Sequence, residues 1–233
     1  MLLINCDLGE RGSANKIDDQ LLEHINIANI ACGGHAGNKE SVDYYTDLCT
    51  KYKIKITAHI SYPDTENFGR KVMQISDIDL LKSFDKQFSL FDDVRAIKPH
   101  GALYNELRVN TKLSRLFINW CRSNDIQELV LSPNGIVTDH AKENDIRVIT
   151  ESFIERGYML NEDNTPVLIP RGEPNAEIRD VSKALEQYIE LNNNWISING
   201  KAIDFSSQTA CIHSDSDIAL ELVKAITKQQ GLV

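Results

Sequence analysis

The chain has 233 residues, a length that suits one α/β domain of barrel size, or two small domains, and permits a large buried core. Its formal charge of −9 argues against non-specific binding to nucleic acid, and no apolar stretch approaches the roughly 20 residues that span a bilayer. Five cysteines without disulfide-type spacing indicate a reducing compartment, and a first strand that begins at residue 2 argues against a signal peptide. We therefore expect a cytoplasmic protein that binds neither nucleic acid nor a membrane.

Short apolar runs typical of β-strands alternate with segments of helical periodicity along the chain. In chain order, the strand-like runs are 2–6, 27–32, 54–58, 94–97, 129–131, 146–149 and 210–212. The helical segments that follow them are 18–26, 38–52, 76–91, 110–121, 134–143, 180–191 and 215–228, with Asn38 and Ser76 as N-caps. About seven such units predict an α/β fold with a parallel sheet that helices cover and that closes, or nearly closes, into a barrel. An open doubly wound sheet is the alternative.

Two segments interrupt this alternation. Residues 195–205 are typical of a β-hairpin, because Asn199-Gly200 between two apolar runs suits a type I′ turn. Residues 157–175 contain Pro166, Pro170 and Pro174, and predict a long loop of the kind that folds over a site. Because neither a Ser/Gly-rich linker nor a charge block divides the chain, we expect a single domain over residues 1–233.

The ends of the predicted strands carry side chains that transfer protons or bind metals. These side chains are Asp7 and Glu10 after the first strand, and His35, His59, His100 and His213 after later ones. A single histidine at a strand end is more often hydrogen-bonded structure than a ligand. In a parallel barrel, however, the carboxyl ends of all strands meet on one face, and that face carries the active site. We therefore expect one site on this rim, with Ser132, Glu151 and Asp215 as weaker additions, and assign no role to His24 or His140.

Other patterns bear on the chemistry of this rim. The glycine-rich turn 32–37 leads into a helix but matches neither the P-loop nor the dinucleotide fingerprint, so the chain has no recognisable ATP site of its own. Arg70 suits a bidentate contact with a carboxylate, or is a solvated loop charge. Lys98 suits the stabilisation of an oxyanion, or is a rim lysine whose stem covers apolar surface. Since a G-x-S-x-G elbow is missing, the residues favour metal-assisted hydrolysis or acid–base attack on an amide.

Several longer motifs resemble those of one known family. They are NCDLGE at 5–10, ANIACG at 28–33, HAG at 35–37, NFGR at 67–70, KPHGALYN at 98–105, RGY at 156–158, LIPR at 168–171 and CIH at 211–213. These motifs span almost the whole chain and none is a common short pattern. Through them the sequence resembles the LamB/YcsF family, whose members are the A subunit of bacterial ATP-dependent 5-oxoprolinase.

The resemblance implies a seven-stranded β/α barrel similar to that of polysaccharide deacetylases, and the opening of 5-oxo-L-proline to L-glutamate coupled to hydrolysis of ATP to ADP and phosphate. It also implies separate subunits B and C, through which ATP is bound. On this basis the expected catalytic residues are Asp7, Glu10, His35, His59, Lys98 and His100. The expected substrate-binding residues are Asn5, Arg70, Tyr104, Arg156 and His213, of which Arg70 or Arg156 would receive the substrate carboxylate. By analogy of fold the site allows a divalent metal, whose ligands would be Asp7, His35, His59 and His100.

The sequence departs from the family at several positions. Gly34 stands where phenylalanine is usual, and we expect it to enlarge or loosen the pocket wall. Asn38 stands where aspartate is usual, and we expect it to remove a charge beside His35. Ile60 replaces a proline, and Ser214 and Ser216 replace small glycine-type positions. These departures leave open an altered efficiency or a different substrate.

Two other functions stay open at this point. One is a stand-alone metal-dependent amide or N-acetyl hydrolase, which would turn over without ATP or partners. The other is a non-catalytic subunit that only binds the lactam for its partners. In that case turnover by the complex would survive alanine substitution of both Asp7 and His100.

Overall fold

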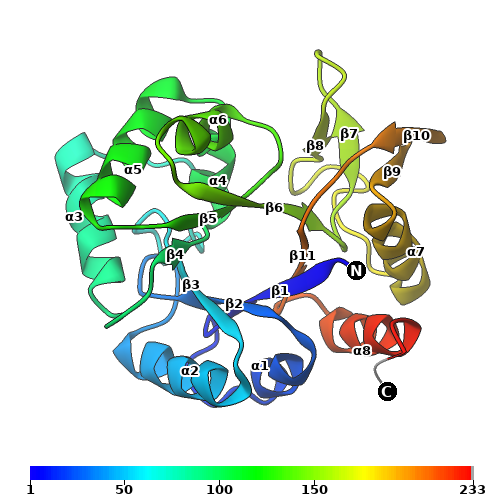
Figure 1. Ribbon diagram of the computed structural model, residues 1–233, viewed down its shortest axis with the longest axis horizontal. Helices are drawn as coiled ribbons and strands as arrows, with labels where there is room; N and C mark the ends of the chain where they lie inside the picture. The colour runs from blue at the N-terminus through cyan, green and yellow to red at the C-terminus, as the bar shows by residue number, and fades with distance from the viewer. Residues whose placement is uncertain (232–233) are drawn as a thin grey trace.

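A closed barrel of parallel strands forms the centre of the molecule (Figure 1). The structure is a computed structural model that describes residues 1–231. Within that range the barrel strands are β1 (Leu3–Leu8), β2 (Ile27–Ala31), β3 (Lys55–His59), β4 (Ala96–Ile97), β5 (Glu128–Leu131), β6 (Arg147–Phe153) and β11 (Thr209–His213). Their order is β1-β11-β6-β5-β4-β3-β2, and parallel pairing of β2 with β1 closes the ring. The predicted seven-stranded α/β barrel is confirmed, and the alternative of an open sheet is wrong.

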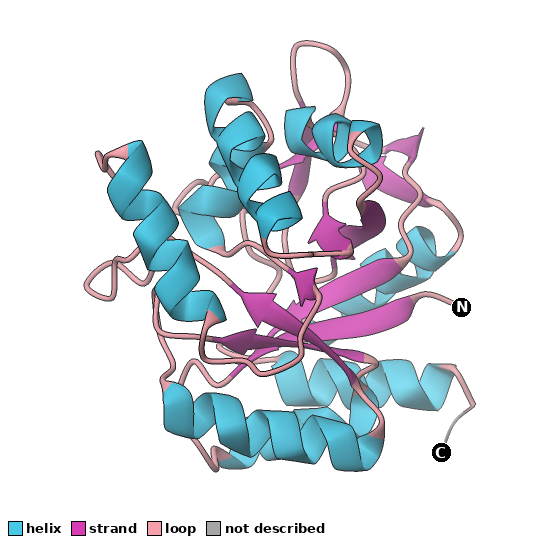
Figure 2. Cartoon of the chain, turned by 60° about the vertical axis from the view of Figure 1, so that its left-hand side comes forward, coloured by secondary structure: helices cyan, strands magenta, loops and turns pink. Residues whose placement is uncertain are grey.

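Helices cover the outside of this barrel (Figures 1 and 2). In residues 1–231 they are α1 (Lys16–Leu21), α2 (Lys39–Tyr52), α3 (Asp77–Phe88), α4 (Gly101–Leu107), α5 (Thr111–Ser123), α6 (Ile136–Glu143), α7 (Val181–Asn192), α8 (Ala219–Gln229) and the short 3-10 helix η1 (Leu22–His24). Asn38 and Ser76 cap α2 and α3 as expected, because their side chains accept backbone N–H groups of the first turn. None of the helices in this range has the length and apolarity that a bilayer crossing requires.

Several boundaries differ from the expectation for physical reasons. The predicted helix 18–26 begins earlier, where Asn15 caps α1, and it ends in η1. Helix α4 is not predicted at all, because its start at Lys98-Pro99-His100-Gly101 has the composition of a turn. Strands β1 and β6 run further than their apolar runs, since inward-facing polar residues continue them inside the barrel.

The interior of the barrel is polar near the carboxyl ends of its strands. Nδ2 of Asn29 donates to Oδ1 of Asn5 and to Oδ1 of Asp7, both at 2.8 Å. Oγ1 of Thr57 donates to Oδ1 of Asn29 at 2.7 Å, and all four side chains are buried. A buried network in which each member has a partner holds its side chains in one arrangement. The floor of the barrel therefore determines the position of Asp7.

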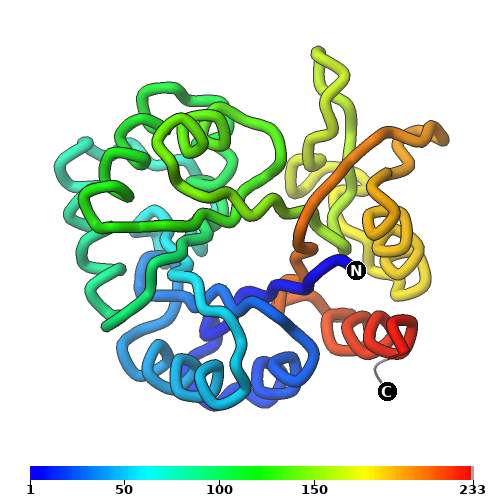
Figure 3. Tube along the Cα trace, viewed as in Figure 1, coloured from blue at the N-terminus to red at the C-terminus, as the bar shows by residue number. Residues whose placement is uncertain are grey.

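Two antiparallel hairpins lie on one side of the barrel, near β6 and β11 (Figures 1 and 3). The expected hairpin consists of β9 (Trp195–Ile198) and β10 (Lys201–Asp204), and Asn199 and Gly200 both have the positive φ that a type I′ turn requires. The segment 157–175 is not wholly irregular, contrary to the prediction, because β7 (Tyr158–Leu160) and β8 (Pro166–Leu168) pair within it. Pro166 is the first residue of β8, a position where proline is tolerated in a strand.

Candidate active site

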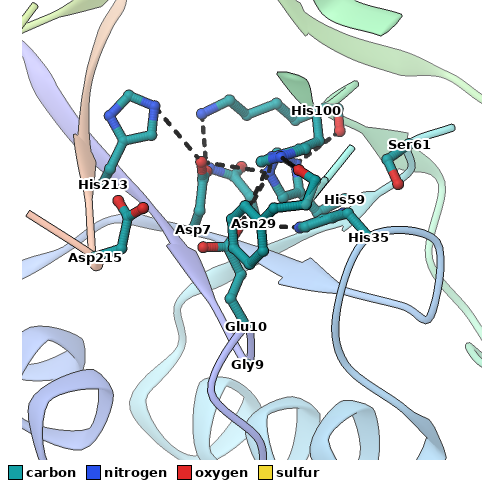
Figure 4. A network of polar contacts seen from close by, with 12 residues as sticks. Asp7, Gly9, Glu10, Asn29, His35, His59, Ser61, His100, His213 and Asp215 are labelled. Carbon is teal, nitrogen blue, oxygen red and sulfur yellow. Dashed lines mark hydrogen bonds and ion pairs between the residues drawn. The ribbon is translucent and has the colours of Figure 1, made fainter. Parts of the chain in front are cut away.

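A cavity of about 1080 Å³ opens at the carboxyl ends of the barrel strands. Asp7, His59, Lys98 and His100 line its inner part, and the β7–β8 segment lines its outer part with residues such as Leu168. Figure 4 shows the carboxylates and imidazoles turned toward one another above the barrel. The strand-end residues that the sequence singled out are thus brought together at the face where barrel enzymes carry their active sites.

His59 and His100 form the centre of this group. Nδ1 of His100 lies 3.0 Å from Nε2 of His59. Oδ2 of Asp7 lies 3.3 Å from Nε2 of His59, and Oε1 of Glu10 lies 3.6 Å from Nδ1 of His100. The four side chains are almost completely buried in the protein. Atoms from β1, β3 and the turns after β1 and β4 therefore meet at one point.

His35 lies beside this centre. Its Nε2 is 2.9 Å from Oε1 of Glu10, and its ring stacks on that of His100 with 3.6 Å between centroids. Among the described residues, its buried Nδ1 has no hydrogen-bond partner. Burial lowers the pKa of His35 to about 3, so the ring is neutral at pH 7.

Burial also shifts the ionisation of the central groups. Burial, together with the nearby carboxylate of Asp7, raises the pKa of Glu10 to about 7. Burial and the neighbouring imidazoles of His35 and His59 hold the pKa of His100 well below its usual range. Burial opposes ionisation of Asp7, but His59 and Lys98 outweigh it and hold the pKa of Asp7 well below its usual range. Asp7 is therefore the carboxylate that stays charged here.

Lys98 lies inside the barrel and anchors Asp7. Its Nζ is 2.9 Å from Oδ1 of Asp7 and 3.2 Å from Oε2 of Glu151. It also lies 3.1 Å from Oδ1 of Asn5 and 3.0 Å from Sγ of Cys211. The alternative of a rim lysine is wrong, since the side chain is only 2% exposed. Because an ammonium has three protons and these acceptors already surround it, the geometry favours a positioning role for Lys98 over contact with an oxyanion.

His213 faces the centre from the opposite side of Asp7. Its Nδ1 and its backbone N–H both contact Oε1 of Glu155, and its Nε2 lies 4.0 Å from Oδ2 of Asp7. Burial lowers the pKa of His213, but the carboxylate of Glu155 outweighs burial and the net shift is upward. The pair therefore favours the protonated form of His213 and directs its Nε2 toward the cavity.

The two arginines expected at the substrate carboxylate lie in different surroundings. Nη2 of Arg70 is paired with Oδ2 of Asp215 at 2.6 Å, at the partly exposed edge of the site. Arg156 is 7% exposed and lines the cavity, while Nε and Nη2 donate to the carbonyl oxygens of Ala176 and Ile169. Within residues 1–231, no carboxylate lies within 4.0 Å of its guanidinium. Burial and the charge of Arg171 lower the pKa of Arg156 to about 10, which leaves it charged at pH 7.

The other two residues expected at the substrate differ from each other. Tyr104 lines the cavity, and in the described part of the chain its buried hydroxyl has no hydrogen-bond partner. Asn5 is fully buried and bonded to Lys98 and Asn29, so it supports the floor of the site. We therefore correct its assignment as a substrate contact, because its polar atoms are used in the barrel network.

The structure also corrects the expectation for Gly34. A Cβ atom at this position would lie 2.3 Å from Oε1 of Gln87 and 2.3 Å from Oγ of Ser61. Gln87 accepts the backbone N–H of Ser61 and donates to its carbonyl oxygen, both at 2.9 Å. The wall is closed by Gln87 and is not enlarged. Asn38 in turn accepts the N–H of Ser41 as the cap of α2, a task that an amide performs as well as a carboxylate.

Two groups of side chains on the rim have the composition of metal ligands. One group is Glu10, His35, His59 and His100, and the other is Asp7, Cys211 and His213. Within each group the potential donor atoms lie within 4.8 Å of one another. The ligand set expected from the sequence is therefore divided, because Glu10 and not Asp7 accompanies the three histidines.

Some residues of the site escape the sequence patterns. Asn29 is a polar residue within the apolar run 27–32, and that interruption is a signal that it faces the barrel interior. Glu155 and Gln87 lie outside every motif that was singled out for chemistry. Only the folded chain brings them to His213 and Ser61.

Comparisons with known proteins give a consistent picture. The model of the LamB/YcsF family matches residues 2–231. A protein of Pyrococcus horikoshii, named as the A subunit of 5-oxoprolinase, is 33% identical over 97% of this chain and 92% of its own length. A protein of Campylobacter jejuni with the same name is 34% identical over 96% of this chain and 91% of its own length. The crystal structure of a lactam utilization protein from Thermus thermophilus has the same fold, with a TM-score of 0.84, 23% identity, and coverage of 99% of this chain and 97% of that one.

Proposed function

This chain belongs to the LamB/YcsF family, and from that premise we propose that it opens 5-oxo-L-proline to L-glutamate as the A subunit of an ATP-dependent 5-oxoprolinase. The names of its relatives support a role with this lactam and with partner subunits. The observation that carries the proposal is the convergence of Asp7, Glu10, His59 and His100 in a cavity beside His213. The site lies in the cytoplasm in this proposal, consistent with five buried, unpaired cysteines in residues 1–231.

The substrate carboxylate binds Arg156 in this proposal. This guanidinium is buried at the cavity without a carboxylate partner from the described residues, whereas Arg70 is already paired with Asp215. A buried charge is costly unless it is compensated, and an arginine binds a carboxylate through charge-assisted hydrogen bonds. The lactam fills a small part of the cavity, because pockets of about 300–1000 Å³ already hold drug-sized ligands. The remaining volume suits the approach of a co-substrate or a partner subunit.

Water attacks the lactam carbonyl carbon in the proposed reaction. The oxygen of water bonds to this carbon, the carbon–nitrogen bond breaks, and the nitrogen gains a proton. Oδ2 of Asp7 takes the proton of the attacking water. Lys98 holds Asp7 ionised for that task. His213, protonated through Glu155, donates from Nε2 to the lactam.

ATP supplies the driving force and is bound with the help of subunits B and C. An amide is a poor electrophile because of resonance, and a five-membered lactam recloses readily. Transfer of the γ-phosphoryl group to the lactam oxygen makes the carbon electrophilic. Ring opening by water then leaves an acyl phosphate, from which a second water molecule releases phosphate and glutamate.

Reconstitution tests this function. The chain is mixed with candidate B and C subunits, and 5-oxoproline-dependent release of phosphate and formation of glutamate are measured. We expect both products with the unmodified chain and neither with Asp7→Asn. Absence of both products with every partner combination would overturn the proposal, and full turnover by Asp7→Asn with His100→Ala would show that the rim only binds the lactam.

A second candidate is a stand-alone metal-dependent amide or N-acetyl hydrolase. The cluster of Glu10 with three histidines favours it, because imidazole and carboxylate groups bind divalent metals. In that case the chain alone, loaded with metal, would hydrolyse simple amides or N-acetyl groups without ATP. Turnover that requires both ATP and the partner subunits would exclude this alternative.

A further inference from the structure

Two histidine rings at the centre of the site each have one nitrogen bonded to a carbonyl oxygen and one nitrogen turned toward the other ring. Nδ1 of His59 lies 2.9 Å from the carbonyl oxygen of Lys98, and Nε2 of His100 lies 2.9 Å from that of Phe68. A carbonyl oxygen only accepts hydrogen bonds, so each of these nitrogens carries a hydrogen. The other ring nitrogens, Nε2 of His59 and Nδ1 of His100, therefore face each other at 3.0 Å as the positions left free for a further partner.

Two carboxylate oxygens, from Asp7 and Glu10, lie close to these two ring nitrogens. Oδ2 of Asp7 lies 3.3 Å from Nε2 of His59. Oε1 of Glu10 lies 4.0 Å from the same nitrogen and 3.6 Å from Nδ1 of His100. Two ring nitrogens and two carboxylate oxygens thus gather in a buried space, and a divalent cation there would compensate both carboxylates and accept the lone pairs of both rings. Ligands at about 2.0–2.1 Å from a tetrahedral metal lie about 3.3–3.4 Å apart, and Nε2 of His59 lies at a similar distance, 3.0 and 3.3 Å, from Nδ1 of His100 and Oδ2 of Asp7.

We propose that Nε2 of His59, Nδ1 of His100, Oδ2 of Asp7 and Oε1 of Glu10 bind one divalent first-row metal ion of the zinc or cobalt class. Two imidazole nitrogens and two carboxylate oxygens form the mixed donor set that such ions accept. The set combines Glu10, His59 and His100 from the first of the two rim groups with Asp7 from the second, and it leaves out His35. The proposal deepens the lactam site and rests on the proposed function for the identity of the substrate. With the ion bound, Oδ2 of Asp7 would hold the ion in place of accepting the proton of the attacking water.

The surroundings of the four donors match what metal ligands need. The carbonyl oxygens of Lys98 and Phe68 fix the tautomer and the orientation of the two rings, as second-sphere acceptors do in metal sites. Oδ1 of Asp7 is held by Asn29, which leaves Oδ2 directed at the centre. Nε2 of His35 lies 2.9 Å from Oε1 of Glu10 and holds that carboxyl group in place, so His35 is a positioning residue in this arrangement.

Metal binding to the full-length chain tests the proposal without any activity assay. The chain is stripped with EDTA, dialysed against Zn²⁺ and analysed for bound zinc, and Co²⁺ serves as a probe through its visible absorption. We expect one tightly bound ion per chain, with affinity reduced more than about 100-fold in His100→Asn and in Glu10→Gln. We expect a loss of about 10–100-fold in His35→Gln, the range for second-sphere groups. The double variant His24→Gln with His140→Gln is the control, and it should bind like the unmodified chain.

Two results would overturn the proposal. One is an unmodified chain that retains no zinc after dialysis and whose melting temperature does not rise with Zn²⁺. The other is a folded Glu10→Gln chain that binds zinc as tightly as the unmodified one, a readout that stays available if His100→Asn does not fold. A complex that binds zinc but does not open the lactam overturns the proposed function alone. A complex that opens the lactam without binding zinc overturns the metal proposal alone.

Discussion

Replacement of Gly34 by alanine should destabilise the protein strongly, although it adds only one methyl group. The new Cβ would lie 2.3 Å from Oε1 of Gln87, so the carboxamide must withdraw from Ser61. The buried N–H and C=O of Ser61 then lose their partners at 2.9 Å. Each unsatisfied buried group costs about 1–3 kcal/mol, so the two groups together predict a loss of about 2–6 kcal/mol in the free energy of unfolding.

A double-mutant cycle with Gln87→Ala isolates the cause. In that background the carboxamide is already gone, but the new methyl group still lies 2.3 Å from Oγ of Ser61, a hydroxyl that must turn aside. We expect the second substitution to cost less there than in the unmodified chain, with a coupling energy of about 2 kcal/mol or more between the two positions. Urea unfolding followed by circular dichroism measures all four variants. Additive losses, or a Gly34→Ala chain within about 0.5 kcal/mol of the unmodified one, would refute the reasoning.

Three further predictions address the groups around the site. Lys98→Met should lower the free energy of unfolding by about 3–5 kcal/mol, because it leaves buried carboxylates without their cation. The control Lys55→Met, at a partly exposed ion pair, should cost less than about 1 kcal/mol. Equal losses in urea unfolding would contradict this prediction. Glu155→Gln removes the carboxylate that raises the pKa of His213. Since the protonated ring is the proposed donor, the activity of the complex should fall, as the pH rises, at a lower pH than in the unmodified complex. An unchanged alkaline limb in the pH–rate profile would exclude His213 as that donor. Arg156→Met should raise KM for 5-oxoproline about 10–100-fold, in line with the loss of a charge-assisted hydrogen bond, and an unchanged KM would assign the carboxylate elsewhere.

Much of the fold could be predicted because its signals are local. The alternation of apolar runs with helical segments depends only on neighbouring residues, and it indicated a barrel of seven parallel strands, which is confirmed. The hairpin at Asn199-Gly200 follows from the φ angles that these two residues tolerate. The pairing of β7 with β8 was not predicted, since Pro166 and the short strands conceal the signal.

The candidate site was predictable as a set of positions but not as a set of roles. His59, His100 and Asp7 could be placed on one rim, because the carboxyl ends of parallel strands meet there. The closure of the wall at Gly34 by Gln87 was missed, since a side chain from α3 fills that space. Likewise, the buried position of Lys98 follows from the closing of the barrel around it and from no feature of its own segment.

By itself, the sequence determined which residues stand at strand ends and therefore on which face of the barrel they lie. Only the tertiary structure decided that Glu10 joins the histidines, that Lys98 holds Asp7, and that His213 pairs with Glu155. The physical reason is the range of the interactions. Periodicity and capping act within one segment, whereas the distance between two polar atoms depends on strand register and side-chain orientation across the whole barrel.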